Sequence, residues 1–169
     1  GALVDVSQNA DPIRDYYPSM SIDRNNYIHI AWEYYASPNT GLAYKVFNGT
    51  AWSAQVFANA TSYSLLQSSL VTDYDGNVHI TFNQYDGSDN EIYYVNNTQG
   101  SFGTPVNVTA DSANELNTFI ALDNQGYAHI IFHNGTAGYV QYIKSTLAVG
   151  PAVPGAILLT IIITAVVLV

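Results

Sequence analysis

The chain has 169 residues, of which 48% are apolar and only 10% are charged, and its formal net charge is −9. Four Lys and Arg stand against 13 Asp and Glu, too few cations to neutralise many phosphates, so nucleic-acid binding is disfavoured. Cysteine is absent, which excludes disulfides, thiol catalysis and cysteine-based zinc sites.

The first expected element is a short strand at residues 2–8. Val4, Val6 and Ser7 stand in register with Thr104, Val106 and Asn107, one hundred residues later. Residues 104–107 end the second of three repeated units, whereas the third unit has no such strand of its own. We therefore expect residues 2–8 to serve as the fourth strand of the third unit.

The three units have a period of fifty residues and lie at about 18–67, 68–117 and 118–146. Their cores align without gaps at residues 22–32, 72–82 and 122–132. The most conspicuous repeated residues are one Asp and one His in each unit: Asp23, Asp73 and Asp123, and His29, His79 and His129. A fixed period of this size is typical of propellers, solenoids or arrays.

Each core predicts a strand, a tight turn and a second strand. The Asp begins the turn, where its carboxylate can accept local backbone N–H groups. Asn26, Gly76 and Gly126 occupy the position that needs a positive φ. Apolar residues then alternate at 28, 30 and 32 and their equivalents, as in a strand with one buried face. Two more strands follow in the first two units, so a unit is a four-stranded antiparallel sheet, the size of a propeller blade.

The hairpin resembles the Asp-box (BNR) repeat of sialidase-like β-propellers. The shared pattern is Asp-x-x-Gly-x-x-His-Ile, at residues 73–80 and 123–130, with Asn26 replacing Gly in the first copy. The usual Trp after the Gly is replaced by His. The resemblance implies an all-β domain at residues 1–146 with three blades, the last closed by the N-terminal strand. Three blades are few for a propeller, so an open arc completed by a neighbour and a flattened β-sandwich remain alternatives.

Sialidase chemistry, which the resemblance suggests, needs three arginines and a Tyr/Glu nucleophile pair. The chain has two arginines, Arg14 and Arg24, although Glu33, Glu91 and Glu115 are present. We therefore expect no sialidase site and predict that the chain is not an enzyme. The repeated His residues lie off a propeller axis and apart from each other, so we expect them to bridge strands rather than to bind a metal.

The sequence contains two further candidate binding sites, one for calcium and one for a sugar. Asp73, Asp75 and Asn77 offer oxygen ligands at alternate positions, as in the start of a calcium loop, although an Asx-stabilised turn is the favoured explanation. No other cofactor is expected. Tyr16, Tyr17, Tyr34, Tyr35 and Tyr63 do not recur with the repeat, which makes them candidates for a sugar-binding surface.

The sequence contains five Asn-x-Thr sequons, whose asparagines are Asn48, Asn59, Asn96, Asn107 and Asn134. All lie near expected loops or strand ends, where N-linked glycans are attached. With a start at Gly1 rather than at Met, they indicate a processed extracellular chain.

Residues 147–169 carry no charge and form a hydrophobic C-terminal segment. Pro154 suits the start of a helix, and a helix from residue 155 would reach about 22 Å against the roughly 30 Å hydrocarbon core of a membrane. Three roles remain open: a membrane anchor, a helix packed in the core of an assembly, or a strand donated to another subunit. The residues expected to make these contacts are Ile157, Leu158, Leu159, Ile161, Ile162, Ile163, Val166 and Val167.

The resulting hypothesis is a non-enzymatic subunit of an extracellular, glycosylated surface assembly, such as a pilus-like filament or a surface layer. The apolar helix would pack in the core of a homo-oligomer or filament. The alternative is a membrane-anchored cell-surface propeller that binds a glycan or a protein partner.

Overall fold

The structure, a computed structural model, describes residues 3–10, 12–37, 39–61, 63 and 65–151. These residues form eleven β-strands. Among them there is no helix that is both long and apolar enough to cross a membrane. The predicted C-terminal helix and its eight contact residues lie outside the described residues.

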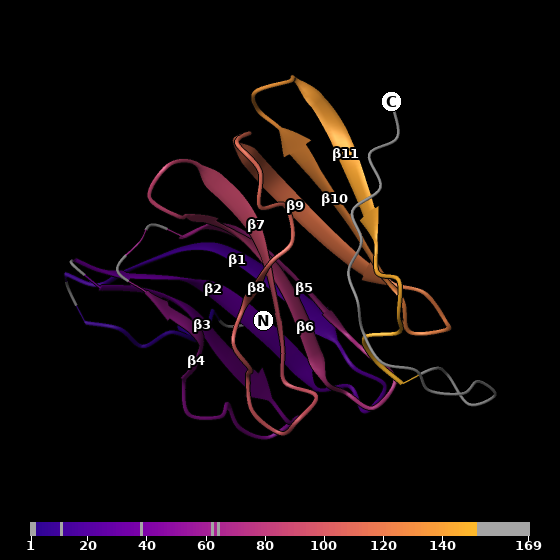
Figure 1. The fold of residues 1–169 in the computed structure, drawn as a ribbon. Helices are drawn as coiled ribbons and strands as arrows, with labels where there is room; N and C mark the ends of the chain where they lie inside the picture. The colour runs from indigo at the N-terminus through magenta and orange to yellow at the C-terminus, as the bar shows by residue number, and fades with distance from the viewer. Residues whose placement is uncertain (1–2, 11, 38, 62, 64, 152–169) are drawn as a thin grey trace.

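The strands form three antiparallel sheets in which chain neighbours pair (Figure 1). Sheet 1 contains β1 (Arg14–Ile22), β2 (Ile28–Ala36), β3 (Asn39–Phe47) and β4 (Val56–Thr61). Sheet 2 contains β5 (Leu65–Thr72), β6 (Val78–Tyr85), β7 (Asn90–Asn96) and β8 (Val106–Asn107). Sheet 3 contains β9 (Glu115–Leu122), β10 (Ala128–Asn134) and β11 (Tyr139–Lys144). The prediction of an all-β fold with three antiparallel sheets is confirmed.

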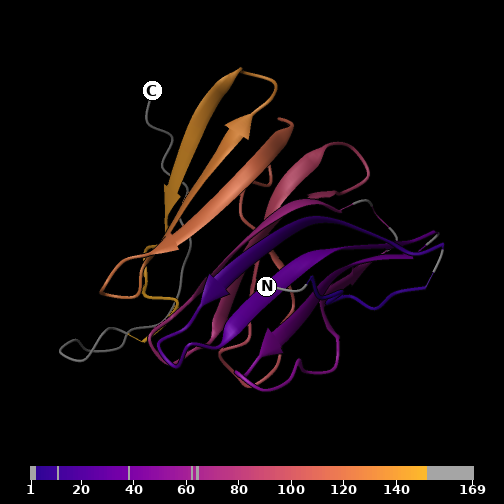
Figure 2. The same ribbon diagram turned by 180° about the vertical axis from the view of Figure 1, so that it is seen from behind.

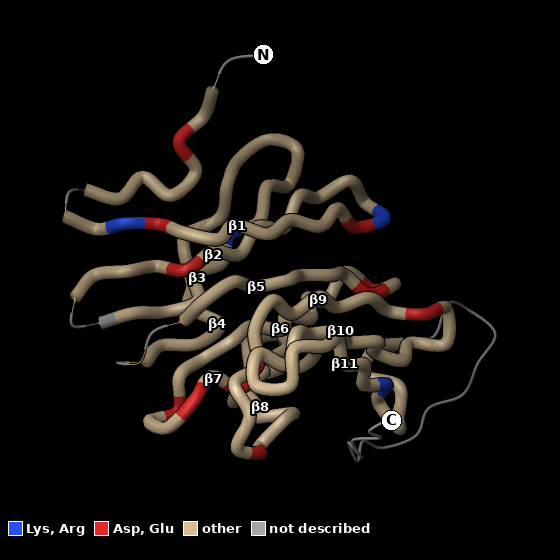
Figure 3. The backbone as a smooth tube through the Cα atoms, turned by 90° about the horizontal axis from the view of Figure 1, so that it is seen from above, with Lys and Arg blue, Asp and Glu red and all other residues tan. Residues whose placement is uncertain are grey.

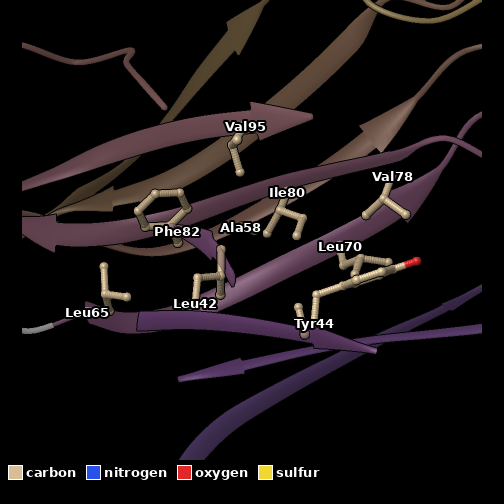
Figure 4. Close-up of a cluster of buried hydrophobic side chains, with 10 residues drawn as sticks. Leu42, Tyr44, Ala58, Leu65, Leu70, Val78, Ile80, Phe82 and Val95 are labelled. Carbon is tan, nitrogen blue, oxygen red and sulfur yellow. The ribbon is translucent and has the colours of Figure 1, made fainter. Parts of the chain in front are cut away.

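Sheet 2 lies between the other two, and the first strands β1, β5 and β9 lie next to one another (Figures 1 and 2). One apolar cluster fills the seam between sheets 1 and 2, with Leu42 and Tyr44 facing Ile80 and Phe82 (Figure 4). A second cluster fills the seam between sheets 2 and 3. Each fully buried Leu, Ile or Phe contributes about 1.5–3 kcal/mol, so the apolar clusters hold the sheets together.

The Asp turn has the same geometry in all three sheets. In the first, Asp23 Oδ1 accepts the backbone N–H groups of Asn25 at 2.9 Å and Tyr27 at 2.8 Å. The equivalent residues in the other sheets make the same pair of bonds. Positive φ occurs at the expected position, 62° at Asn26 and 85° and 83° at the two glycines.

A second repeated feature, not expected from the sequence, is a β-bulge in the first strand of each sheet. Tyr17, Gln67 and Asn117 all have positive φ, at 49°, 43° and 56°. The pairing register shifts beside each of them. None is glycine, so the bulge holds a left-handed residue that has a side chain.

The expected N-terminal strand is wrong. Residues 3–10 form no strand, because Asp5 Oδ1 accepts the Gln8 backbone N–H at 3.0 Å and the Ser7 hydroxyl at 3.1 Å, which turns the chain. Lys45 Nζ donates to the Val6 carbonyl at 2.8 Å and holds this segment against sheet 1. Figure 3 shows it on the opposite side of the molecule from β11. Among the described residues β11 pairs with β10 alone.

The chain continues in the fold past residue 146, where we expected the domain to end. Val149 is buried in the cluster between sheets 2 and 3, and its N–H donates to the Gly126 carbonyl at 2.8 Å. Residues 147–151 therefore belong to the β-domain rather than to the hydrophobic tail.

Candidate functional site

Each repeated His lies between an Asp and a Tyr. In sheet 2, His79 Nε2 is 3.2 Å from Asp73 Oδ2, and His79 Nδ1 is 2.7 Å from the Tyr94 hydroxyl. Sheet 3 has the same chain of contacts at 3.0 Å and 2.8 Å. In sheet 1, His29 Nδ1 is 2.6 Å from the Tyr44 hydroxyl, while its Nε2 is 3.7 Å from Asp23. The three His residues stay apart in separate sheets, and each links the turn to the third strand.

The Asp73 carboxylate accepts several hydrogen bonds, most of them from its own turn. Besides His79, it accepts the backbone N–H groups of Asp75 and Asn77 and the Asn77 side-chain amide, each at 2.9 Å. Burial alone would raise the pKa of Asp73, but hydrogen bonds from His79 and Asn77 hold it below the usual value. This geometry agrees with an Asx-stabilised turn, and the calcium site at Asp73, Asp75 and Asn77 stays a prediction without support from the arrangement.

The three Asp turns surround a hollow of about 370 Å³. The residues that follow the Asp, Arg24, Tyr74 and Asn124, all line it. The Arg24 guanidinium lies 4.2 Å from the centre of the Tyr74 ring, a cation–π contact that joins sheets 1 and 2.

Three of the five candidate tyrosines gather at the opposite end of sheet 1. The ring of Tyr16 lies 6.1 Å from that of Tyr17 and 6.5 Å from that of Tyr35, and all three are exposed. Tyr34 instead packs edge-on against Phe57, and Tyr63 packs against Tyr85.

The sequon asparagines differ in access. Asn48 is exposed in a turn, while Asn59, Asn96 and Asn107 are half-buried. Asn134 is buried, and its Nδ2, the atom that would carry a glycan, donates to Glu115 and Gln141. A glycan on Asn134 is therefore incompatible with this fold.

Five acidic residues gather at the seam between sheets 2 and 3, at the end away from the Asp turns; we call them the seam acids. They form two overlapping groups that share Glu91: Asp86, Asp89 and Glu91, and Glu91, Asp111 and Glu115. Within each group one carboxylate oxygen of every residue lies within 4.8 Å of the others. In Figure 3 acidic segments surround β7 and β8, with no basic segment among them.

The connection from β8 to β9 positions the second group. The Thr109 hydroxyl donates to Glu91 Oε2 and accepts the Ile92 N–H at 3.0 Å. Asn114 Oδ1 accepts the Asn90 side-chain amide at 2.8 Å, which ties the end of the connection to β7. Burial raises the pKa of Glu115 to about 7, and the nearby charges of Asp111, Glu91 and Asp89 act in the same direction.

All three glutamates of the chain are buried, which the repeat pattern does not predict. A signal was present at Glu91, because an acid there breaks the repeat, whereas the position of Glu115 also carries an acid in the first unit. Glu91 stands where the other units have Gly41 and, by strand pairing, Tyr139, and Glu115 stands where they have Asp15 and Leu65.

The outer face of sheet 3 is apolar and exposed. It carries Phe119, Ile131, Val140 and Tyr142, which we call the sheet 3 outer face. Strand pairing makes Val140 equivalent to Leu42 and Ile92. Val140 is 69% exposed, whereas Leu42 is 1% and Ile92 0% exposed, because each of the latter is covered by the next sheet.

No family model and no curated protein matches the chain. Among solved structures, the endo-arabinase from Bacteroides thetaiotaomicron VPI-5482 aligns with a TM-score of 0.54 and 14% identity over 78% of this chain. The chain spans about half of that enzyme, whose length is 55% covered. A fucose lectin from Kordia zhangzhouensis, in complex with methyl-fucoside, aligns with a TM-score of 0.48 and 14% identity, covering 83% of this chain and 99% of the lectin.

At 14% identity the likeness to the arabinase concerns the fold alone. It nevertheless corrects the prediction that the chain is not an enzyme. That prediction rested on the missing third arginine of a sialidase site, and an endo-arabinase, an enzyme of another kind, has a similar fold. The count of arginines excludes the sialidase clamp and no other chemistry.

Proposed function

We propose that this chain is a self-associating subunit of an extracellular assembly, an open arc of three propeller blades that binds a second copy through the sheet 3 outer face. The observation that carries the proposal is the exposure of this face, whose equivalents are buried in sheets 1 and 2. Contiguous exposed apolar residues mark interaction sites.

The partner surface is the outer side of sheet 1 on another copy. Met20 is equivalent to Leu70 and Ile120, which sheets 2 and 3 bury against the preceding sheet. Sheet 1 has no preceding sheet among the described residues. Residues 3–10 cover part of this side at Lys45, which lies on the same face as Met20, but Met20 is still 61% exposed, with Ile22 exposed beside it. A head-to-tail contact between copies would thus repeat the seams already present within the chain.

We call the sheet 3 outer face and the outer side of sheet 1 the free faces. At both of them, apolar residues replace the polar residues found at the equivalent positions of the seams. Inside the chain the seams pair small polar groups, Ser19 with Ser68 at 3.2 Å and Thr118 with Thr81 at 3.0 Å. In a copy-to-copy seam the equivalent pairs would be Phe119 with Pro18 and Pro18 with Ile131. Both polar partners are replaced by apolar ones, so the faces are complementary.

A head-to-tail contact closes into a ring if the rotation per subunit permits and otherwise makes a filament. The hydrophobic segment from residue 152 would then add a second contact, in the assembly core or in a membrane.

Two complementary variants of the full-length chain in mild detergent test the contact. Val140→Asp damages the sheet 3 outer face, and Met20→Asp damages the sheet 1 face. Light scattering after size exclusion should show higher oligomers for the unchanged chain and monomers for each variant alone. An equimolar mixture should give dimers only, because each variant keeps one intact face.

Val106→Asp is the matched control, because Val106 is an exposed apolar residue of the middle sheet that lies on neither free face. It should assemble as the unchanged chain does. Unchanged oligomers in both test variants would mean that the hydrophobic tail alone drives assembly, and the proposal would fail.

A second candidate function is carbohydrate binding at Tyr16, Tyr17 and Tyr35. Exposed, closely spaced aromatic rings offer stacking surfaces with an apolar body and a polar tip. The fold shared with an endo-arabinase supports a polysaccharide ligand. Calorimetry with arabino-oligosaccharides should detect binding that Tyr16→Ala abolishes and Tyr63→Ala leaves intact. An absence of binding heat for both the unchanged chain and Tyr63→Ala would reject this function.

A further inference from the structure

The seam acids contain a buried oxygen that nothing in the protein satisfies. Glu115 is 0% exposed, and its Oε1 accepts the Asn134 side-chain amide at 3.2 Å. Its other oxygen, Oε2, is buried and has no hydrogen-bond partner among the described residues. Asp89 Oδ1 is in the same condition. A buried carboxylate oxygen without a partner costs several kcal/mol unless a charge or donor neutralises it.

No basic side chain fills this role. Among the described residues, Lys144 pairs with Asp123, Lys45 bonds the Val6 carbonyl, and Arg24 lies over Tyr74. The fourth cation, Arg14, is exposed at the start of β1 in sheet 1. None of the ion pairs among the described residues involves a seam acid. The cluster thus concentrates negative charge in a chain that already carries a net −9.

We propose that Glu91, Asp111 and Glu115 bind a calcium ion at the seam between sheets 2 and 3. One carboxylate oxygen of each residue lies within 4.8 Å of the others, and Glu115, whose buried Oε2 has no hydrogen-bond partner among the described residues, belongs to this group. All the ligands are oxygens, which hard cations prefer, and neither His nor Cys is among them to favour zinc or copper.

Calcium suits the irregular arrangement better than magnesium does. The three carboxylates come from β7, from the loop before β9 and from the first residue of β9. Calcium accepts six to eight oxygens in flexible geometry, whereas magnesium demands a near-ideal octahedron and keeps several waters. Asp111 is exposed and leaves one side of the site open to water ligands.

The ion would join the middle sheet to the last one. Glu91 belongs to sheet 2 and Glu115 to sheet 3, so a shared ion cross-links two sheets that otherwise meet through apolar contacts and few hydrogen bonds. The site is independent of the free faces used in the proposed assembly, and calcium should stabilise monomers and oligomers alike.

The test uses the full-length chain in detergent, stripped with EDTA and titrated with CaCl2. Calorimetry should show one site per chain, and saturating calcium should raise the Tm by about 5 °C. Asp111→Asn should weaken calcium binding at least tenfold while folding normally, because the Asn Oδ1 can still accept the Ala113 N–H. Glu115→Gln should abolish the Tm increase.

Asp75→Asn is the matched control, since it removes an exposed acid from the other calcium candidate, the turn at residues 73–77. It should bind calcium as the unchanged chain does. No calcium-dependent heat and no change in Tm would overturn the proposal. It would equally be overturned if Asp111→Asn bound calcium normally or if Asp75→Asn alone lost binding.

Discussion

Sheets 2 and 3 are formed by the same fifty-residue repeat, yet they differ in how many neighbouring sheets cover them. Sheet 2 has a neighbour on both faces, while sheet 3 has one on its inner face only. Ile92 is buried and the equivalent Val140 is exposed; His79 is buried and His129 is half-exposed. The difference teaches that the repeat specifies strands and turns, whereas burial depends on which sheet comes next.

The largest expected difference between the two sheets is the stability lost when the equivalent residues Ile92 and Val140 are shortened to Ala. Ile92→Ala should lower the free energy of unfolding by about 2–5 kcal/mol, because it opens a cavity in a filled seam. Val140→Ala should cost less than about 0.5 kcal/mol in dilute monomer, since the side chain is in water. Urea unfolding followed by tyrosine and tryptophan fluorescence measures both. Equal losses at low concentration would mean that the exposed face is covered within one chain.

The Asp–His–Tyr contacts of sheets 2 and 3 should differ less in their contribution to the free energy of unfolding. His79→Ala leaves the Asp73 carboxylate and the Tyr94 hydroxyl buried without their partner, and should cost about 2–3 kcal/mol. His129→Ala should cost about 1 kcal/mol or less, because water reaches its partners. Thermal melting of the two variants side by side is sufficient. A larger loss for His129 would show that sheet 3 is less accessible to water than its surface suggests.

The seam between sheets 1 and 2 offers the smallest effect, one that depends on pH. Burial raises the pKa of Glu33 to about 7, partly offset by the Leu65 N–H. The folded chain therefore holds a proton that the unfolded chain releases, and stability falls as pH rises from about 4.5 to 7. Glu33→Gln removes this loss, so its advantage over the unchanged chain should grow to the order of 2 kcal/mol by pH 8.

Urea unfolding at several pH values measures this difference, and other groups titrating in the range cancel in the comparison. A constant difference between pH 5 and 8 would show that Glu33 does not carry the buried proton.

The strands and Asp turns were predictable because they depend on local chemistry. The alternation around His79 and the Asp73 turn repeat three times, so each copy supports the others. The prediction of a closing strand at residues 2–8 was wrong because it rested on a sequence match of a few residues. Such a match does not account for competing local hydrogen bonds, here those that Asp5 accepts from Ser7 and Gln8.

The seam acids were not predictable from the repeat. Glu91 and Glu115 meet because β7 and β9 face each other across a seam, and neither lies in a repeated motif. Asp111 belongs to a connection whose path depends on Asn114 and Thr109. Only Glu91, an acid where the other units have Gly41 and Tyr139, marked the place in advance.

The bulge at Tyr17, Gln67 and Asn117 bears on how such a chain avoids misassembly. β1, β5 and β9 are edge strands, and three repeated units of the same architecture in one chain invite mispairing of their edges. A left-handed residue in each edge interrupts the regular row of N–H and C=O groups that an incoming strand would need. Copies of this chain can then associate through side chains on their faces, and the resulting polymer would differ in kind from an amyloid, whose strands add backbone to backbone.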